Sequence, residues 1–350
     1  LVSIGTSVPE LASSITASLA QASGIVMGNV LGSNIANIGL IVGIAGLLST
    51  VKTEELMLKR DGYIMLFSAL LFFLFILDFR ISKTEAFIFL LLYSVYLLFL
   101  LDKVRKHEED IYFKGFMIYL IKFEYIFDIK ARIETGVKGR IEKKRIKKAI
   151  KETYGETEEE SKKEEQIQSE NKTYSENKTY SEIKTEYETE IQNETENFSE
   201  SSLLIELIKL TASGVAIIIG AKYFVEQSIF FALLLDIPET IVGISLVAVG
   251  TSLPELMVTV SASRSGYASI GLGNVIGSNI TNILLILGCS GLVHPLTVTE
   301  NTVYYIAPFM LFISLLLLLF IRTGWRIKRY EAVILLLIYS GFMIFIFRLG

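Results

Sequence analysis

The sequence predicts an all-α polytopic membrane protein that contains an inverted repeat of five-helix units. Three observations predict this fold class: a series of long apolar segments, an internal repeat, and the confinement of most charges to one stretch. Residues 103–200 hold 20 of the 33 Lys and Arg residues and 23 of the 37 Asp and Glu residues. The rest of the chain is therefore too apolar for a soluble protein of this size.

Nine apolar segments follow one another along the chain, and each is long enough or nearly long enough to cross a bilayer. A helix rises about 1.5 Å per residue, so about 20 residues span the hydrocarbon core. The shorter segments reach the interfaces through flanking charged residues such as Arg60, Arg80 and Lys83. The nine expected segments are residues 1–21, 25–48, 61–79, 82–101, 203–235, 238–262, 268–293, 302–321 and 331–348.

An internal repeat relates residues 1–48 to residues 246–293, which align without gaps and are identical at 25 of 48 positions. Two motifs recur in both copies: Gly-Thr-Ser-x-Pro-Glu at 5–10 and 250–255, and Gly-Asn-Val-x-Gly-Ser-Asn-Ile at 28–35 and 273–280. Five expected crossings separate the copies, so the copies face opposite sides of the membrane. Inverted repeats of this kind are typical of secondary transporters.

The repeat divides the chain into a first membrane repeat at residues 1–101, a loop at 102–202 and a second membrane repeat at 203–350. Leu1 matches Leu246, which in the second copy lies well inside a segment that follows another helix. We therefore expect that the first repeat lacks its first helix and half of its second.

Loop charges predict the orientation of the protein in the membrane, because cytoplasmic loops carry an excess of Lys and Arg. The loops near 51–60, 264 and 322–329 hold eight basic residues, whereas the opposite side holds three. This places the loop 102–202 in the cytoplasm of an integral, multi-pass protein, and we expect the cell membrane as its location.

The loop begins basic and ends acidic. Residues 111–129 are rich in aromatic side chains but contain four charges, so we expect an amphipathic helix at the membrane interface. The basic stretch 103–151 is expected to contact anionic lipid. Low complexity, including a repeated Ser-Glu-Asn-Lys-Thr-Tyr at 169–180, predicts disorder in the acidic half.

Two carboxylates, Glu10 and Glu255, lie in the middle of apolar segments at matched positions of the repeat. An ionisable side chain at membrane depth is costly and indicates a functional site. Thr6 and Ser7 lie within one helical turn of Glu10, and Thr251 and Ser252 repeat this arrangement around Glu255.

A proline precedes each of these glutamates and is expected to kink or break its helix. Pro9 and Pro254 lack an N–H, so the carbonyls four residues earlier lose their partners. Freed carbonyls of the turns 3–7 and 248–252, which begin at Ser3 and Ala248, could then coordinate a cation.

Polar side chains recur every four residues in the following helices: Asn29, Ser33 and Asn37 in one, and Asn274, Ser278 and Asn282 in the other. Each set forms a stripe on one helix face, which could either line a site or join packed helices. Gly28 and Gly32, with their mates Gly273 and Gly277, allow neighbouring helices to approach closely.

All the candidate ligands are oxygens, which favours hard cations such as Ca²⁺ and Na⁺ over transition metals. The chain has one cysteine and two histidines, which excludes an internal disulfide, a zinc cluster and a multi-histidine site. We expect no cofactor, no nucleic-acid partner and no enzymatic activity, since no catalytic constellation is evident.

At these motifs the sequence resembles the sodium/calcium exchanger family of the calcium/cation antiporter superfamily, in its prokaryotic form. The resemblance covers both repeats but not the loop, and it implies ten helices, nine of which are present. It implies that Glu10 and Glu255 are the central calcium ligands. It further implies sodium binding by Thr6, Ser7, Thr251 and Ser252, flanking carbonyls at Ser3 and Ala248, and a lining of Ser33, Asn37, Ser278 and Asn282.

The predicted function is antiport of Na⁺ and Ca²⁺ by alternating access. The choice of Na⁺ as the coupling ion and the movement of helices that alternates the access both follow from the resemblance. In the family, Asp at position 282 accompanies potassium dependence, so Asn282 indicates a potassium-independent exchanger. A proton/calcium antiporter is the main alternative. A cation channel is disfavoured by an inverted repeat within one chain.

Overall fold

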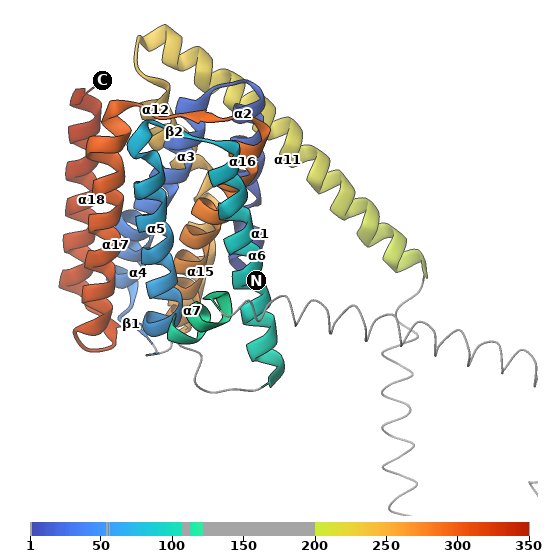
Figure 1. Ribbon diagram of the computed structural model, residues 1–350. Coiled ribbons are helices and arrows are strands. Elements are labelled where there is room, and N and C mark those ends of the chain that lie inside the picture. Colours follow the sequence, from blue (N-terminus) through green and yellow to red (C-terminus); the bar gives the residue numbers. More distant parts are fainter. Residues whose placement is uncertain (1, 54, 56, 107–112, 122–199, 350) are drawn as a thin grey trace, which may run out of the picture. The chain divides into compact units, whose positions relative to one another are not determined.

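The computed structural model describes residues 2–53, 55, 57–106, 113–121 and 200–349. The chain divides into two compact units, residues 1–122 with 214–350, and residues 123–213. The first unit contains both copies of the repeat and is almost entirely helical (Figure 1).

The first repeat consists of membrane helices interrupted by short π- or 3₁₀-helical turns, which are labelled η. Its elements are α1 (Val2–Thr6), α2 (Val8–Leu19), α3 (Ser23–Ala36), η1 (Asn37–Val42), α4 (Gly43–Leu48), β1 (Val51–Lys52), η2 (Met57–Gly62), α5 (Tyr63–Phe75), η3 (Ile76–Asp78), β2 (Arg80–Ile81) and α6 (Lys83–Lys106), followed by α7 (Phe113–Ile121).

The second repeat consists of α11 (Glu200–Leu235), α12 (Glu239–Val242), η4 (Gly243–Val247), α13 (Ala248–Thr251), α14 (Leu253–Arg264), α15 (Ala268–Thr281), η5 (Asn282–Ile286), α16 (Leu287–Val293), β3 (Leu296–Thr297), η6 (Thr302–Ile306), α17 (Ala307–Arg322), β4 (Arg326–Ile327) and α18 (Arg329–Leu349). From α13 onward the second repeat follows the order of the first, apart from η3, and α11, α12 and η4 precede this part.

Among the described residues, seven of the nine expected membrane segments are helices long and apolar enough to span a bilayer. The expected segment 238–262 consists of two helical parts, Glu239–Thr251 and Leu253–Arg264, that meet at a bend of 46°. The expected segment 1–21 contains two shorter helices, α1 and α2, that break at the matching position. Both departures from continuous helices occur at the proline motifs, where the sequence predicts a kink or break.

The structure extends the repeat well beyond the 48 aligned residues. Helices α2 and α14 begin and end 245 positions apart, as do α3 and α15, and strands β1 and β3 also begin 245 positions apart. Helices α6 and α18 start 246 positions apart, and each has in its first turn a glutamate that caps the start of the helix. Glu85 accepts a 2.8 Å bond from the backbone of Ser82, and Glu331 accepts one of 2.8 Å from Lys328.

Two short sheets show that the repeats are inverted. Strand β1 pairs antiparallel with β4, and β2 pairs antiparallel with β3. The membrane helix α5 separates β1 from β2, and the two strands lie at opposite ends of the bundle (Figure 1). Since β1 and β3 are equivalent in the repeat but lie at opposite ends, the two copies have opposite orientations, as the crossing count predicts.

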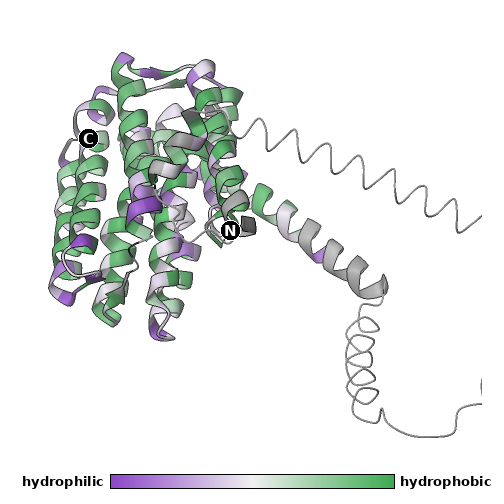
Figure 2. Cartoon of the chain, turned by 60° about the horizontal axis from the view of Figure 1, so that its bottom comes forward, coloured by the Kyte–Doolittle hydropathy of each residue, from purple (hydrophilic) through white to green (hydrophobic). Residues whose placement is uncertain are grey.

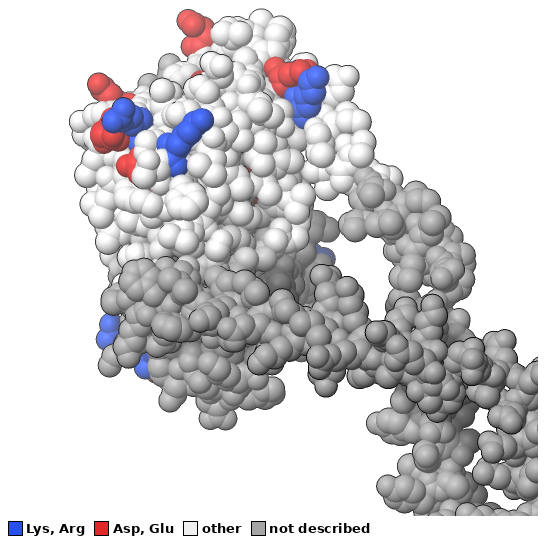
Figure 3. Space-filling view, turned by 45° about the vertical axis from the view of Figure 1, so that its right-hand side comes forward, with Lys and Arg blue, Asp and Glu red and all other residues white. Residues whose placement is uncertain are grey.

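The core of the bundle consists of the two helices that carry the Gly-Asn motifs. The share of the most apolar stretch that is buried within the protein is 83% in Ser23–Leu48 and 78% in Ala268–Val293. In the other spans this share is 22–44%. The outer helices consist mainly of hydrophobic residues (Figure 2). In Figure 3 most of the visible charged side chains gather at the upper end and a few basic ones at the lower edge, and the broad area between them is almost free of charge, as expected for a lipid-facing surface.

Helix α7 lies within the expected amphipathic segment 111–129. Its 9 described residues are too few to cross a bilayer by themselves. Its aromatic side chains pack on α5 and α6, where the ring centroids of Phe99 and Phe116 are 5.6 Å apart and those of Tyr63 and Phe113 6.1 Å. Residues 122–199, including the acidic half of the loop, lie outside the described residues.

Candidate cation-binding site

The two Gly-Thr-Ser-x-Pro-Glu motifs form matched breaks in their helices. Ser7 separates α1 from α2 with φ −84° and ψ 8°, and Ser252 separates α13 from α14 with the same angles within one degree. Pro9 and Pro254 occupy the first turn of the helix that follows, where their missing N–H costs no helical bond. The breaks therefore follow from the sequence motif itself and appear in both repeats.

The carboxylates of Glu10 and Glu255 are buried at the breaks and are 1% and 0% exposed. Each is held by a serine of the opposite repeat: Ser252 Oγ donates to Glu10 Oε1 at 3.1 Å, and Ser7 Oγ donates to Glu255 Oε1 at 3.2 Å. Ser278 Oγ donates a further bond of 3.4 Å to Glu255 Oε1. The crossed bonds bring together two motifs that lie 245 residues apart in the chain.

The threonines of the motifs bond the first asparagines of the polar stripes, again across the repeats. Thr251 Oγ1 lies 3.0 Å from Asn29 Oδ1, and Thr6 Oγ1 lies 3.4 Å from Asn274 Oδ1. Asn29 also donates to Ser14 Oγ at 2.8 Å. The oxygens of Asn29 and Asn274 are thus engaged by hydroxyl groups, which favours a role for these two asparagines in joining helices.

The carbonyls of Ser3 and Ala248, expected near the site, accept several hydrogen bonds in the structure. Ser3 O accepts from the backbone of Ser7 at 3.1 Å and from Thr6 Oγ1 at 3.3 Å. Ala248 O accepts from the backbone N–H of Ser252 at 3.1 Å and from Ser33 Oγ at 3.5 Å, and it lies 3.3 Å from Thr251 Oγ1, whose one proton it shares with Asn29 Oδ1. Coordination of a cation by these carbonyls would therefore compete with the hydroxyl bonds.

Close helix packing brings the glycines of each Gly-Asn motif against these carbonyl segments. A Cβ atom on Gly32 would lie 2.7 Å from Ala248 Cβ, and one on Gly277 would lie 2.6 Å from Ser3 Oγ. A side chain at either position would push the helices apart, because real Cβ contacts are longer than this. The two glycines thus allow the polar stripes to approach the helix breaks.

Asn37 and Asn282, the last residues of the polar stripes, each begin a π-helical turn, η1 in one repeat and η5 in the other. Such turns within α-helices frequently occur at functional sites. Both side chains are 1% exposed. The sequence predicts these residues as site members but gives no signal for the π-helical turns.

Four oxygens in this region are buried and accept no hydrogen bond from any described group: Glu10 Oε2, Glu255 Oε2, Asn37 Oδ1 and Asn282 Oδ1. A buried acceptor without a partner is costly, and a buried carboxylate without a partner more so. Two carboxylate and two amide oxygens are the ligand types that Ca²⁺ and Na⁺ prefer. The donor set therefore fits a hard cation as cargo.

Other groups predicted or excluded as ligands lie apart from this site. Lys222 and Glu226 form an exposed i,i+4 pair with 3.9 Å between Nζ and Oε1. Among the described residues, no three His, Cys, Asp or Glu side chains gather into a metal-binding group. The candidate site therefore relies on two carboxylates and neutral oxygens.

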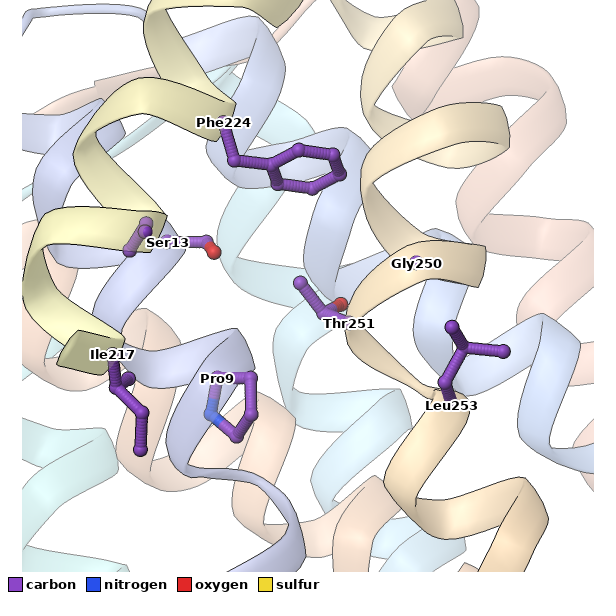
Figure 4. A pocket seen from close by; sticks show the side chains of 9 residues that line it. Pro9, Ser13, Ile217, Phe224, Gly250, Thr251 and Leu253 are labelled. Carbon is purple, nitrogen blue, oxygen red and sulfur yellow. The ribbon is translucent and has the colours of Figure 1, made fainter. Parts of the chain in front are cut away.

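A cavity of about 470 Å³ lies beside both helix breaks (Figure 4). Pro9, Thr251 and the α11 residues Ile217 and Phe224 are among the residues that line it. The Phe224 ring lies close to Gly250, where an added Cβ would be 3.1 Å from Phe224 Cζ. The cavity therefore connects the long helix α11 with the motif that carries Thr251.

The inverted repeats, with buried carboxylates bonded across them, define a polytopic helical membrane transporter. The chain belongs to the sodium/calcium exchanger protein family, whose model matches residues 1–101 and 206–348. Sequence reasoning reaches the same family from the two motifs, and this identification is confirmed.

The chain is similar to several known proteins, to some of them over nearly its whole length. It is 50% identical to the sodium/calcium exchanger MaX1 of Methanosarcina acetivorans over 99% of this chain and 87% of the relative. A solved structure of the sodium-calcium exchanger NCX_Mj soaked with 100 mM Na⁺ and 10 mM Sr²⁺ matches with a TM-score of 0.54 and 25% identity, covering 97% of this chain and 82% of that one. Human sodium/potassium/calcium exchanger 5 is 29% identical over 31% of this chain and 23% of the relative.

Proposed function

We propose that this protein is a secondary antiporter that exchanges Na⁺ for Ca²⁺ by alternating access. One observation carries the proposal: Glu10 and Glu255 are buried together, and each keeps one carboxylate oxygen without a hydrogen-bond partner. Two buried negative charges without a described basic partner favour a bound cation strongly. The relatives named sodium/calcium exchangers support Ca²⁺ and Na⁺ as the two ions.

In this proposal the same oxygens hold either one Ca²⁺ or several Na⁺. Glu10 and Glu255 are the central Ca²⁺ ligands, and they share Na⁺ with Thr6, Ser7, Thr251 and Ser252. The carbonyls of Ser3 and Ala248 complete flanking Na⁺ sites, while Ser33, Asn37, Ser278 and Asn282 line the middle. Competition for the two carboxylates couples the ion fluxes, because neither ion can bind fully while the other is present.

Access to the site would alternate through movement of α11 relative to the broken helices. The cavity between Phe224, Pro9 and Thr251 supports this, since it lies where a sliding α11 would open or close the approach to the helix breaks. The inverted orientation of the repeats supports it as well, because each repeat can supply the gate on one side.

The loop and the location of the protein complete the proposal. Residues 102–202 would form a cytoplasmic loop of a protein in the cell membrane, and the basic stretch 103–151 would contact anionic lipid. The aromatic packing of α7 against the bundle supports a position close to the membrane surface for the start of this loop.

Calcium uptake into proteoliposomes that contain the full-length protein tests the proposal. Gradients of Na⁺, H⁺ and K⁺ are applied separately, and uptake is expected to require the Na⁺ gradient alone. Uptake driven by H⁺ and indifferent to Na⁺ would favour the proton/calcium antiporter instead. A requirement for K⁺ would contradict the potassium independence that Asn282 indicates.

A further inference from the structure

Two buried asparagines outside the predicted stripes, Asn34 and Asn279, connect the centres of the two repeats. They occupy equivalent positions in α3 and α15, one residue after Ser33 and Ser278, and each is 1% exposed. Their place in the helix puts them about 100° from the stripe, so the four-residue spacing gives no reason to select them.

Each of these asparagines bonds the amide nitrogen of a candidate ligand in the other repeat. Asn282 Nδ2 donates to Asn34 Oδ1 at 3.0 Å, and Asn37 Nδ2 donates to Asn279 Oδ1 at 2.9 Å. The bonds decide which way the two ligand amides are turned. Their nitrogens are occupied by the opposite repeat, while Asn37 Oδ1 and Asn282 Oδ1 remain without a partner.

Two methionines fix the orientation of Asn34 and Asn279 in turn. Asn34 Nδ2 lies 3.6 Å from Met310 Sδ. Asn279 Nδ2 lies 3.7 Å from Met65 Sδ and 3.3 Å from the backbone carbonyl oxygen of Asn34. Met65 and Met310 are themselves 245 positions apart, on α5 and α17, and are 1% and 0% exposed. Each thioether is a weak acceptor that cannot donate.

Reversal of either asparagine amide would therefore be doubly unfavourable. If Asn34 were turned over, its oxygen would face the Met310 sulfur, where two acceptors would meet. Its nitrogen would face Asn282 Nδ2, where two donors would meet. The sulfur thus selects the orientation of Asn34, and Asn34 selects that of Asn282. The same chain of contacts runs from Met65 through Asn279 to Asn37.

We propose that Asn34 and Asn279 are positioning residues which, with Met310 and Met65, hold the amide oxygens of Asn282 and Asn37 ready for the transported cation. This inference rests on the proposed cation site. An amide turned the other way would present its N–H groups, which repel a cation, so the network favours ion binding without touching the ion. Its expected effect is on ion affinity, because the ligands are oriented before the ion arrives.

Met65→Leu and Met310→Leu test the inference with little change in volume, since Leu and Met exchange readily in cores. Loss of one N–H···S bond should raise the half-saturating Ca²⁺ and Na⁺ concentrations about 2- to 10-fold. The maximal exchange rate at saturating ions should change much less. Met27→Leu is the matched control, because Met27 is 1% exposed on α3 and takes part in none of the network bonds among the described residues.

Asn34→Leu and Asn279→Leu remove the acceptor that holds the ligand amide, so the half-saturating concentrations should rise by about tenfold or more. Thermal unfolding of each purified variant separates affinity from folding. If an Asn variant fails to fold, the two Met variants still decide the question. Unchanged affinity in both Met variants, or an equal change in Met27→Leu, would overturn the inference.

Equilibrium binding of ⁴⁵Ca²⁺ to the purified full-length protein distinguishes this inference from the proposed function. If the wild-type protein bound no Ca²⁺, the proposed function would fail. If the wild-type protein bound Ca²⁺ and the Met65→Leu and Met310→Leu variants bound it equally well, only the positioning role would fail. Weaker binding in both variants, with Met27→Leu unchanged, is the expected result.

Discussion

Ser252 Oγ donates a 3.1 Å hydrogen bond to Glu10 Oε1, although the two residues are 242 positions apart. The equivalent bond of the other repeat joins Ser7 to Glu255 at 3.2 Å. Each serine occupies the break of its own helix and bonds the carboxylate of the opposite repeat. A movement that displaces one repeat relative to the other must therefore stretch or break bonds at the candidate cation site.

Glu10→Gln and Glu255→Gln are each expected to abolish Ca²⁺ exchange, because each removes half of the negative charge that compensates a divalent ion. The measurement is Na⁺-driven ⁴⁵Ca²⁺ uptake into proteoliposomes. Glu226→Gln is the control, since Glu226 is exposed and paired with Lys222 away from the site. Wild-type uptake by either site variant would remove that glutamate from the ligand set.

Ser7→Ala and Ser252→Ala are expected to weaken ion binding about 5- to 10-fold, because each carboxylate loses a hydroxyl donor and the site loses a neutral oxygen ligand. Half-saturating Na⁺ and Ca²⁺ concentrations measure the effect. Ser68→Ala is a suitable control, since Ser68 is equally buried but bonds only the Ile64 carbonyl of its own helix at 2.8 Å. An equal effect in all three variants would indicate general loss of packing.

Gly32→Ala is expected to lower the free energy of unfolding by about 1–3 kcal/mol and to reduce exchange, because the new Cβ overpacks a helix contact. It would lie 2.7 Å from both Ala248 Cβ and Ile244 Cα. Thermal unfolding in detergent and transport assays measure the two effects. Gly341→Ala has open space around its Cβ and should leave both unchanged. A fully stable and active Gly32→Ala would contradict the close packing.

A cysteine at position 217 should report the movement proposed for α11, since Ile217 lines the cavity next to the helix breaks. In a Cys289→Ser background, the rate at which Ile217→Cys reacts with a charged thiol reagent should differ between Na⁺ and Ca²⁺. Leu337→Cys, on the exposed apolar face of α18, serves as the control. Identical rates at position 217 under all ion conditions would argue against a moving α11.

Much of the fold could be predicted from the apolar segments and the repeat, because lipid exposure leaves helices as the main way to satisfy the backbone. How far the repeat extends along the chain could not be predicted from the sequence. Sequence identity is high over residues 1–48, where glycines and polar ligands are constrained, whereas α5 and α17 only need to be apolar. The pairing of strands β1 and β4 reveals the part of the repeat that sequence identity does not, because this pairing depends on where the loops between helices meet in space.

The sequence by itself determined the two carboxylates, the helix breaks at Pro9 and Pro254, and the inverted arrangement, since each follows from local chemistry or from counting segments. Only the tertiary structure decided which groups bond which. The crossed serine–glutamate bonds and the contacts of Asn34 and Asn279 with Met310 and Met65 join residues from different repeats. Such partners are set by the packing of helices distant in sequence, which no spacing within one helix can specify.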